Sequence, residues 1–398
     1  TAGQPFTFEF GLLASPAHPF APNYPLDTLT ESFCTSFNRP GRRPLYDVAL
    51  LSSDETYLKG GDLGCFFGDL ETPAGLAESN RIAHIIRVSE GGRGGRLVPY
   101  TCTRYLSGKY PEVAAFLPEW TYRPEVAMDY SNSGHVIYDC CPTTTASDFY
   151  VWRFREMLRR FPGLKGIYCD FDTVHQCSNA DHGCNDRTPI LGWREFNRRL
   201  IVAQVEAGIE NPVIVLHNTD CVQLPAMTFA THLLNGENVR QSSSDLLHDK
   251  KDILDTYGYE RFACELSSLP WGLSNSVYMP FDTLSAEHGG DEKNAPYKFR
   301  MGKASIGACL LHNTMQCTWR NHVGLFDKVL RCLDGFGVVA MVTMTPLVTI
   351  QILGAVYAVK ERKLAAAKLP EPLEEEEEIF MDEIIFEFTD DDEIIEFA

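Results

Sequence analysis

Short apolar runs alternate with amphipathic stretches along most of this chain, and that alternation limits its fold more than any other feature. The apolar runs have the length of buried strands, and the stretches between them repeat apolar residues at roughly helical spacing. Strand, helix and strand in repetition imply parallel pairing with helical crossovers. At 398 residues, the chain is long enough for a closed barrel, which we favour over an open sheet. The sequence therefore predicts an α/β fold, a (β/α)8 TIM-like barrel with a short β-rich or acidic extended C-terminal extension.

The expected elements follow the same pattern. Helices are expected at 141–161, ended by Pro162 and Gly163, and at 192–208, with Gly208 as the C-cap. Residues 298–313 are expected to form a helix that runs into a strand. The expected strands lie at 6–15, 47–51, 96–101, 166–171, 212–218 and 227–237.

The expected barrel domain covers residues 1–336, and two different segments follow it. Residues 337–359 carry no charge and precede KERK, so their length would suit a membrane span with the C-terminus inside. Their Thr, Pro and Gln content favours instead a last barrel segment and linker, 337–370. Residues 371–398 alternate acidic and apolar blocks, which is typical of an acidic tail or an edge hairpin.

The charge argues against nucleic acid and against an anionic membrane surface as partners, because both require clustered Lys and Arg. The net charge is -19, and residues 371–398 hold 14 acidic residues and no basic one, which leaves 40 acidic against 35 basic residues elsewhere. Thirteen cysteines are an odd number, so at least one is free or pairs between chains. The opening TAGQPFTFEF has no Met and no apolar leader, so we expect a removed leader or a piece of a longer protein.

In residues 164–184, LKGIYCDFDTVHQCSNADHGC, an apolar strand ends at two acids, Asp170 and Asp172. A buried carboxylate costs several kcal/mol unless it is paired, so acids at a strand end usually mark a site at the mouth of a sheet. In a barrel, chemistry lies at the carboxyl ends of the strands. The alternative is a barrel with incidental polar rim residues. The polar residues that follow the apolar runs are Tyr100, Asp170, Asp172, His217, Asn218, Asn235, Glu237, His312 and Asn313.

Several segments in order resemble a group of largely uncharacterised bacterial glycoside-hydrolase-like proteins related to the family 123 glycosidases. The segments are 8–20, 97–101, 141–153, 166–184, 213–220 and 233–239. The resemblance implies a TIM-barrel catalytic domain, with an Asp ending the fourth strand and a Glu ending a later strand in an Asp-Gly-Glu context. It covers about residues 6–337, and Asn235 stands where that group has its Asp. The group's N-terminal β-sandwich and its β-rich C-terminal domain find no match in this chain.

The resemblance implies cleavage of a glycosidic bond. This reaction needs a carboxylic acid that protonates the leaving oxygen and a second group that stabilises or attacks the cationic anomeric carbon. We expect Asp170 to be the nucleophile or electrostatic stabiliser and Glu237 the general acid. Asp172 shares a strand face with Asp170 and is expected to replace it or to orient an acetamido group. The alternative for Asp170 is a buried helix cap or an ion-pair partner, and Glu237 has a purely structural role as its alternative.

A saccharide is the expected ligand, because the apolar face of a sugar ring packs flat on an aromatic ring. We expect one or two platforms among Trp120, Trp193, Trp271, Trp319 and Tyr100. The expected substrate-binding residues are Tyr100, His217, Asn218, Asn235, Trp271, His312 and Trp319. The alternative function is an inactive carbohydrate-binding or surface-assembly protein on the same fold, which 337–359 would anchor in a membrane. The expected location is extracellular or in the cell envelope.

The loop after the Asp170 strand contains His175-x-Cys177 and His182-x-Cys184. Two His and two Cys can bind zinc tetrahedrally, although zinc fingers usually place two to four residues between paired ligands. A Cys177–Cys184 disulfide and a pair of free thiols are the two alternatives. No other cofactor is expected.

Overall fold

The computed structural model describes residues 33–34, 48–51, 73–90, 96–129, 136–170, 174–184, 187–217, 223–236, 258–267, 271–278, 307–309, 311–312 and 314–318. The chain divides into two units, Thr1–Val338 and Val339–Ala398, and every described residue belongs to the first. The expected strand at 6–15, the apolar segment 337–370 and the acidic segment 371–398 lie outside the described residues.

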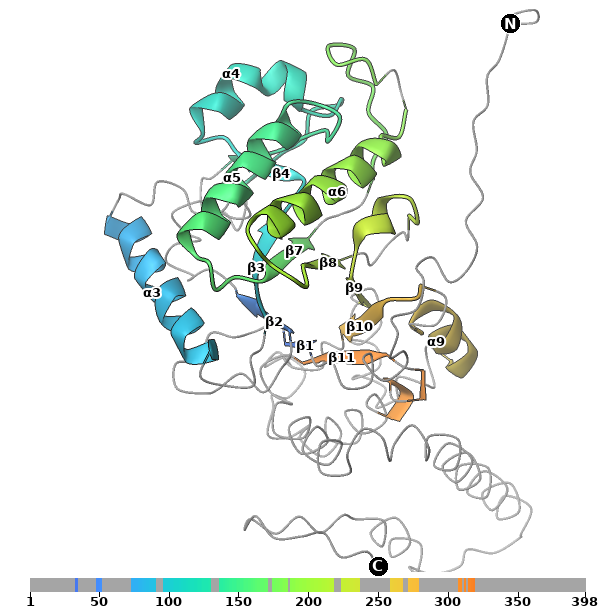
Figure 1. Ribbon diagram of the computed structural model, residues 1–398. Helices are drawn as coiled ribbons and strands as arrows, with labels where there is room; N and C mark the ends of the chain where they lie inside the picture. Colours follow the sequence, from blue (N-terminus) through green and yellow to red (C-terminus); the bar gives the residue numbers. More distant parts are fainter. Residues whose placement is uncertain are drawn as a thin grey trace, which may run out of the picture. The chain divides into compact units, whose positions relative to one another are not determined.

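Within the described part of the chain, strands form a closed barrel in which each neighbouring pair is parallel, in the order β1-β11-β10-β9-β8-β7-β3-β2 (Figure 1). The predicted α/β barrel is confirmed. The strands are β1 (Phe33–Cys34), β2 (Val48–Leu51), β3 (Arg96–Cys102), β7 (Gly166–Asp170), β8 (Val213–His217), β9 (His232–Asn235), β10 (Ser274–Tyr278) and β11 (Met315–Thr318).

Alternate residues of each strand face the helices and the barrel interior. Ile167 of β7 belongs to one buried cluster with Phe154 and Leu200, which come from helices outside the barrel. Because side chains alternate along a strand, Tyr168 and Asp170 lie on the opposite face from Ile167, toward the interior. Both faces of the strand are covered, which explains why the barrel strands read as near-continuous apolar runs.

Helices α5 (Ala146–Arg160) and α6 (Ile190–Glu206) lie side by side over this part of the barrel (Figure 1). The buried face of α5 repeats at helical spacing and includes Tyr150, Phe154 and Met157, whereas Trp152 is exposed. The predicted helix is confirmed over Ala146–Arg160, and Trp152 lies on its solvent side. Further helices in the described part of the chain are α3 (Pro73–Glu90), α4 (Pro111–Trp120), the 3-10 helix η2 (Ala226–Phe229) and α9 (Tyr259–Glu265).

Helix α6 ends as its sequence predicts. Gly208 has φ 80°, its N–H donates to the carbonyl of Val205, and the N–H of Ile209 donates to the carbonyl of Gln204. This pair of bonds is the Schellman motif, which needs a left-handed residue and therefore favours glycine.

A small antiparallel sheet, in the order β4-β6-β5, follows β3 and lies outside the barrel. Its strands are β4 (Tyr105–Ser107), β5 (Ala127–Asp129) and β6 (Val136–Asp139). Sequence reasoning did not predict this sheet, because its strands are only three or four residues long.

Two predicted elements were wrong in part. The strand expected at 227–237 begins as η2, and only His232–Asn235 is a strand. In the segment 298–313, the described residues 307–309 are helical, and the strand β11 starts later, at Met315. In both places an apolar run continues from a helical turn into a strand, and periodicity over so few residues does not separate the two. None of the helices that the structure describes is long and apolar enough to cross a membrane.

Candidate active site at the carboxyl end of the barrel

Asp170 is the last residue of β7, and two neighbouring strands supply donors to its carboxylate. The hydroxyl of Tyr100, on β3, donates a hydrogen bond to Oδ2. Nδ1 of His217, the last residue of β8, lies 2.9 Å from Oδ1. The Asp170 side chain is 15% exposed, so it is largely but not fully shielded from solvent. The predicted convergence of Tyr100, Asp170 and His217 at this rim is observed.

Strand register explains why these three residues meet. Tyr100 pairs with Tyr168, and Cys102 pairs with Asp170, so β3 and β7 are aligned at their carboxyl ends. Cys169 pairs with Leu216, which puts His217 beside Asp170 on the next strand. Parallel strands in register deliver residues of one face to one end of the barrel.

Tyr168 completes the group and was not predicted. Its hydroxyl lies 2.7 Å from Nδ1 of His217, and its ring stacks on Tyr100 with centroids 5.3 Å apart and planes 22° from parallel. The sequence signal was its position two residues before Asp170, which places both side chains on one strand face. Tyr168 stands inside an apolar run, so from the sequence it resembles an ordinary core residue. In the structure it is 2% exposed.

The electrostatics of the group keep Tyr100 as a donor. Burial raises the pKa of Tyr100 well above its usual value, and the neighbouring Cys102 and Asp170 raise it further. Tyr100 is therefore protonated at neutral pH and can donate to Asp170. Two donors on separate oxygens stabilise negative charge on this carboxylate.

Several predicted site residues lie outside the described part of the chain: Asp172, Asn218, Glu237, Asn313 and Trp319. Glu237 directly follows Gly236, whose φ of 89° ends the extended conformation of β9.

Asn235, predicted to bind substrate, ends β9 but lies on its other face. It is 7% exposed, and it shares its strand face with Leu233, two residues earlier, which belongs to the core cluster shared with the helices. Its Oδ1 accepts a hydrogen bond from the N–H of Gly236 at 2.7 Å. The structure thus gives Asn235 a role in ending the strand rather than a place beside Asp170.

Trp271 and His312 were also predicted to bind substrate, and the structure places both at the opposite end of their strands. Trp271 precedes β10 and packs against the main core, while His312 precedes β11 and lies against Phe262 with ring centroids 5.4 Å apart. They flank the amino ends, where barrel residues serve stability. The prediction failed because the apolar run before His312 includes helical residues. Trp120 and Trp193 are core residues, 3% and 1% exposed.

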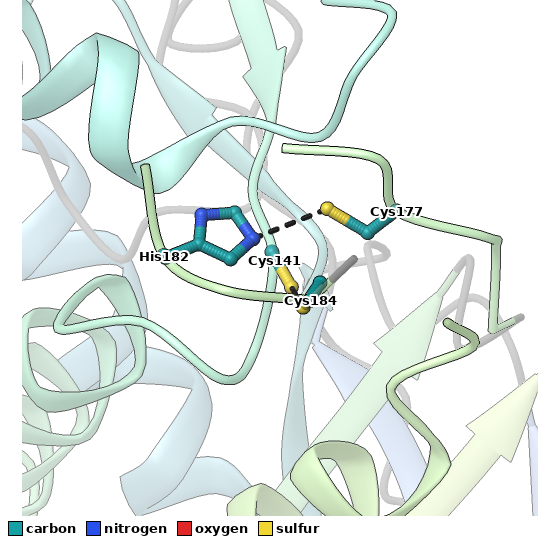
Figure 2. A group of neighbouring side chains, drawn as sticks. All are labelled: Cys141, Cys177, His182 and Cys184. Carbon is teal, nitrogen blue, oxygen red and sulfur yellow. Dashed lines mark hydrogen bonds between the residues drawn. The ribbon is translucent and has the colours of Figure 1, made fainter. Parts of the chain in front are cut away.

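The loop after β7 forms a sulfur-rich cluster, with a different composition from the predicted one. Cys177, His182 and Cys184 meet Cys141, and their ligand atoms all lie within 4.8 Å of one another (Figure 2). His175 is outside this group; it is exposed and lies edge-on to Tyr122, with ring centroids 6.3 Å apart. Cys177 and Cys184 carry free thiols, so the alternative disulfide is not formed.

Cys141 was missed because it is remote in sequence from the loop. It follows β6 in the run Asp139-Cys140-Cys141, directly before the turn into α5. The adjacent cysteines were the available signal, but no spacing rule connects them to the loop after β7.

Comparisons with known proteins give low similarity throughout. No protein-family model matches the chain. A search of curated proteins finds no match either. The solved structures include a trehalose-6-phosphate hydrolase of Bacillus licheniformis, with a TM-score of 0.45 and 10% identity, covering 79% of this chain and 72% of that one.

Two further structures match smaller shares. An α-galactosidase of Thermus thermophilus in complex with stachyose gives a TM-score of 0.43 at 16% identity, over 72% of this chain and 58% of that one. A maltogenic α-amylase of Thermotoga neapolitana gives a TM-score of 0.38 at 9% identity, over 58% of this chain and 50% of that one. The chain thus spans between half and three-fifths of the length of these two proteins.

Proposed function

We propose that this chain is a glycoside-hydrolase-like protein that processes a saccharide at the carboxyl end of its barrel. The observation that carries the proposal is Asp170, a shielded carboxylate that receives a hydrogen bond from Tyr100 and lies 2.9 Å from Nδ1 of His217. A nucleophile or electrostatic stabiliser of a cationic anomeric carbon must be negatively charged and oriented. Donors on both oxygens supply charge stabilisation and orientation together.

Glu237 is the proposed general acid. It follows the end of β9, and β9 is the second strand from β7 in the barrel. Its separation from Asp170 would decide the stereochemistry: about 5 to 5.5 Å for retention and about 6.5 to 9.5 Å for inversion. Asp172, two residues after Asp170, is the proposed substitute or orienting acid.

The test compares Asp170→Asn and Glu237→Gln on aryl glycosides with good and poor leaving groups. Asp170→Asn should lower kcat/KM at least about 10³-fold on every substrate that the unmodified chain cleaves, because the charge at the anomeric carbon is lost. Glu237→Gln should lose about 10²- to 10⁴-fold on poor leaving groups and far less on good ones, which need no proton.

Asp148→Asn is the matched control, since Asp148 is an exposed acid on α5 that pairs with Arg199. It should leave kcat/KM unchanged. Hydrolysis at the unmodified rate by Asp170→Asn would refute the assignment of that residue.

The alternative is a catalytically inactive carbohydrate-binding or structural barrel. It is favoured by Asn235, which stands where the resembled proteins have an Asp. That alternative predicts saturable glycan binding, measured by calorimetry, without product release from any glycoside in the panel. Binding that is weakened by Asp170→Asn, in the absence of turnover, would establish it.

A further inference from the structure

Three buried thiols and one imidazole converge beside the barrel, at a place that the proposed hydrolase site does not use. Figure 2 shows Cys141, Cys177, His182 and Cys184 directed toward a common centre. Sγ of Cys177 lies 3.1 Å from Nε2 of His182, and Sγ of Cys141 lies 3.7 Å from Sγ of Cys184. We propose that these four side chains form a structural Cys₃His zinc site.

One sulfur pair lies at the separation that a tetrahedral zinc ion requires, and the Cys177–His182 contact of 3.1 Å is shorter than the ideal edge. Zn–S bonds of about 2.3 Å and Zn–N bonds of about 2.0 Å imply S···S edges of about 3.8 Å and S···N edges of about 3.5 Å. The Cys141–Cys184 separation of 3.7 Å matches the first value, and the four ligand atoms fit within 4.8 Å. A disulfide requires a sulfur separation of about 2.05 Å, which this pair does not have.

The donor set selects the kind of ion. Three thiolates and one imidazole suit zinc, whereas Ca²⁺ and Mg²⁺ require oxygen ligands. Cys141 and Cys177 are fully buried, and Cys184 is 8% exposed. Four protein ligands in a closed setting are typical of structural zinc sites, since a catalytic zinc keeps one position for water or substrate.

An outer contact orients the imidazole as a metal ligand. Nδ1 of His182 lies 2.5 Å from the backbone carbonyl of Glu119, an acceptor, so Nδ1 carries the proton and donates it. Nε2 is then unprotonated, with its lone pair available toward the three sulfurs. Metal-bound histidines nearly always donate their other ring N–H to a carbonyl or carboxylate in this way. This contact is independent of the cysteine geometry.

A hydroxyl is also placed to support two of the sulfurs. Oγ1 of Thr143 lies 3.1 Å from Sγ of Cys141 and 3.3 Å from Sγ of Cys184. A hydroxyl can donate one hydrogen bond, which would stabilise a thiolate that is bound to a metal.

The site would join three parts of the fold. Cys141 follows the small sheet and precedes α5, while the other three ligands belong to the loop after β7. In the same loop, Nδ2 of Asn179 donates to the carbonyls of Pro118 and Thr121 at 2.8 and 2.7 Å, at the end of α4. Zinc would therefore fix the loop that begins after Asp170 against the α4 and α5 side of the barrel.

The experiment measures zinc in the full chain purified without chelators. We expect about one zinc per chain by elemental mass spectrometry. The Cys177→Ser/Cys184→Ser double variant should lose it. Cys264→Ser, which changes an exposed thiol on α9, should keep it and is the matched control. Equal zinc content in the double variant and the control would overturn the site.

Cobalt replacement tests the ligand set itself, even if the double variant does not fold. Cobalt-loaded chain should show tetrahedral d–d bands and a thiolate charge-transfer band that scales with the number of thiolates. His182→Cys should keep the metal and strengthen that band, whereas His182→Ala should bind cobalt more weakly. A chain that takes up neither metal, with its cluster thiols free or with Cys141 and Cys184 joined in a disulfide, would overturn the proposal.

Discussion

Nδ1 of His217 lies 2.9 Å from Oδ1 of Asp170, so the ends of two neighbouring barrel strands are linked through their side chains. The hydroxyl of Tyr168 lies 2.7 Å from the same ring nitrogen. A carboxylate can only accept here, and therefore Nδ1 must carry the proton when Asp170 is ionised. His217 then acts on Asp170 by orienting it and by stabilising its charge, which makes it a positioning residue in the proposed function.

Tyr100→Phe should weaken any function of Asp170 without unfolding the protein, because it deletes one donor and keeps the stacked ring. A hydrogen bond to a charged group contributes about 1.5 to 3 kcal/mol, which corresponds to a fall in kcat/KM of roughly 10- to 100-fold. The measurement is kcat/KM on a cleaved glycoside. Tyr110→Phe is the matched control, since the Tyr110 hydroxyl accepts a hydrogen bond from Arg153 on α5. Equal losses in the two variants would contradict a specific role for Tyr100.

Tyr100→Phe and His217→Gln should not be additive. Both residues donate to Asp170, one to each carboxylate oxygen, and removing either one loosens the group on which the other acts. A double-mutant cycle in kcat/KM, or in glycan affinity, should give a coupling of about 0.5 to 3 kcal/mol. Strict additivity would show that the two residues do not act through Asp170.

Gly166→Ala should destabilise the barrel. A Cβ at this position would lie 2.6 Å from both Cβ and the backbone oxygen of Val213 on β8, and 2.8 Å from Cγ1 of Val98 on β3. Overpacking of this kind costs about 1 to 3 kcal/mol, which urea unfolding would show as a lower midpoint. Gly307→Ala, where a Cβ meets nothing within 4 Å, should change stability by less than about 0.5 kcal/mol. A neutral Gly166→Ala would mean that β7 and β8 can separate without loss.

His312 should make stability depend on pH on the acidic side of neutrality. Burial lowers the pKa of His312 from its ordinary value of 6.5, so the folded protein binds fewer protons there than the unfolded chain. The stabilisation is present above pH 6.5 and is lost as the pH falls toward the lowered pKa of the folded state.

The test is urea unfolding between pH 7 and pH 5, where His312→Gln should lose less stability than the unmodified chain. His84→Gln, which changes an exposed residue on α3, should follow the unmodified chain. The prediction fails if His312→Gln keeps the full dependence on pH.

Local features of the sequence predicted the parts of the fold that depend on neighbouring residues. Gly208 ends α6 because only glycine adopts its left-handed backbone without strain, and that requirement is visible in the sequence. Asp170 could be placed at the end of β7 because an acid interrupts an apolar run there. The alternation of strands and helices likewise predicted the parallel barrel.

The interpretation went wrong where an apolar run changes from helix to strand. His312 was assigned to the carboxyl end of a strand, yet β11 begins three residues after it, so the residue lies at the opposite end of the barrel. Apolar runs that contain both helix and strand have no single period. Periodicity therefore does not show where the strand begins, or which of its ends lies beside a given residue.

By itself the sequence determined the class of fold, the last turn of α6 and the acid at the end of β7, because each depends on contacts between residues that are close in the chain. Only the tertiary structure decided that Tyr100 and His217 meet at Asp170, and that Cys141 joins the loop of Cys177. Those meetings depend on strand register and on packing between remote segments, and no spacing along the chain encodes them.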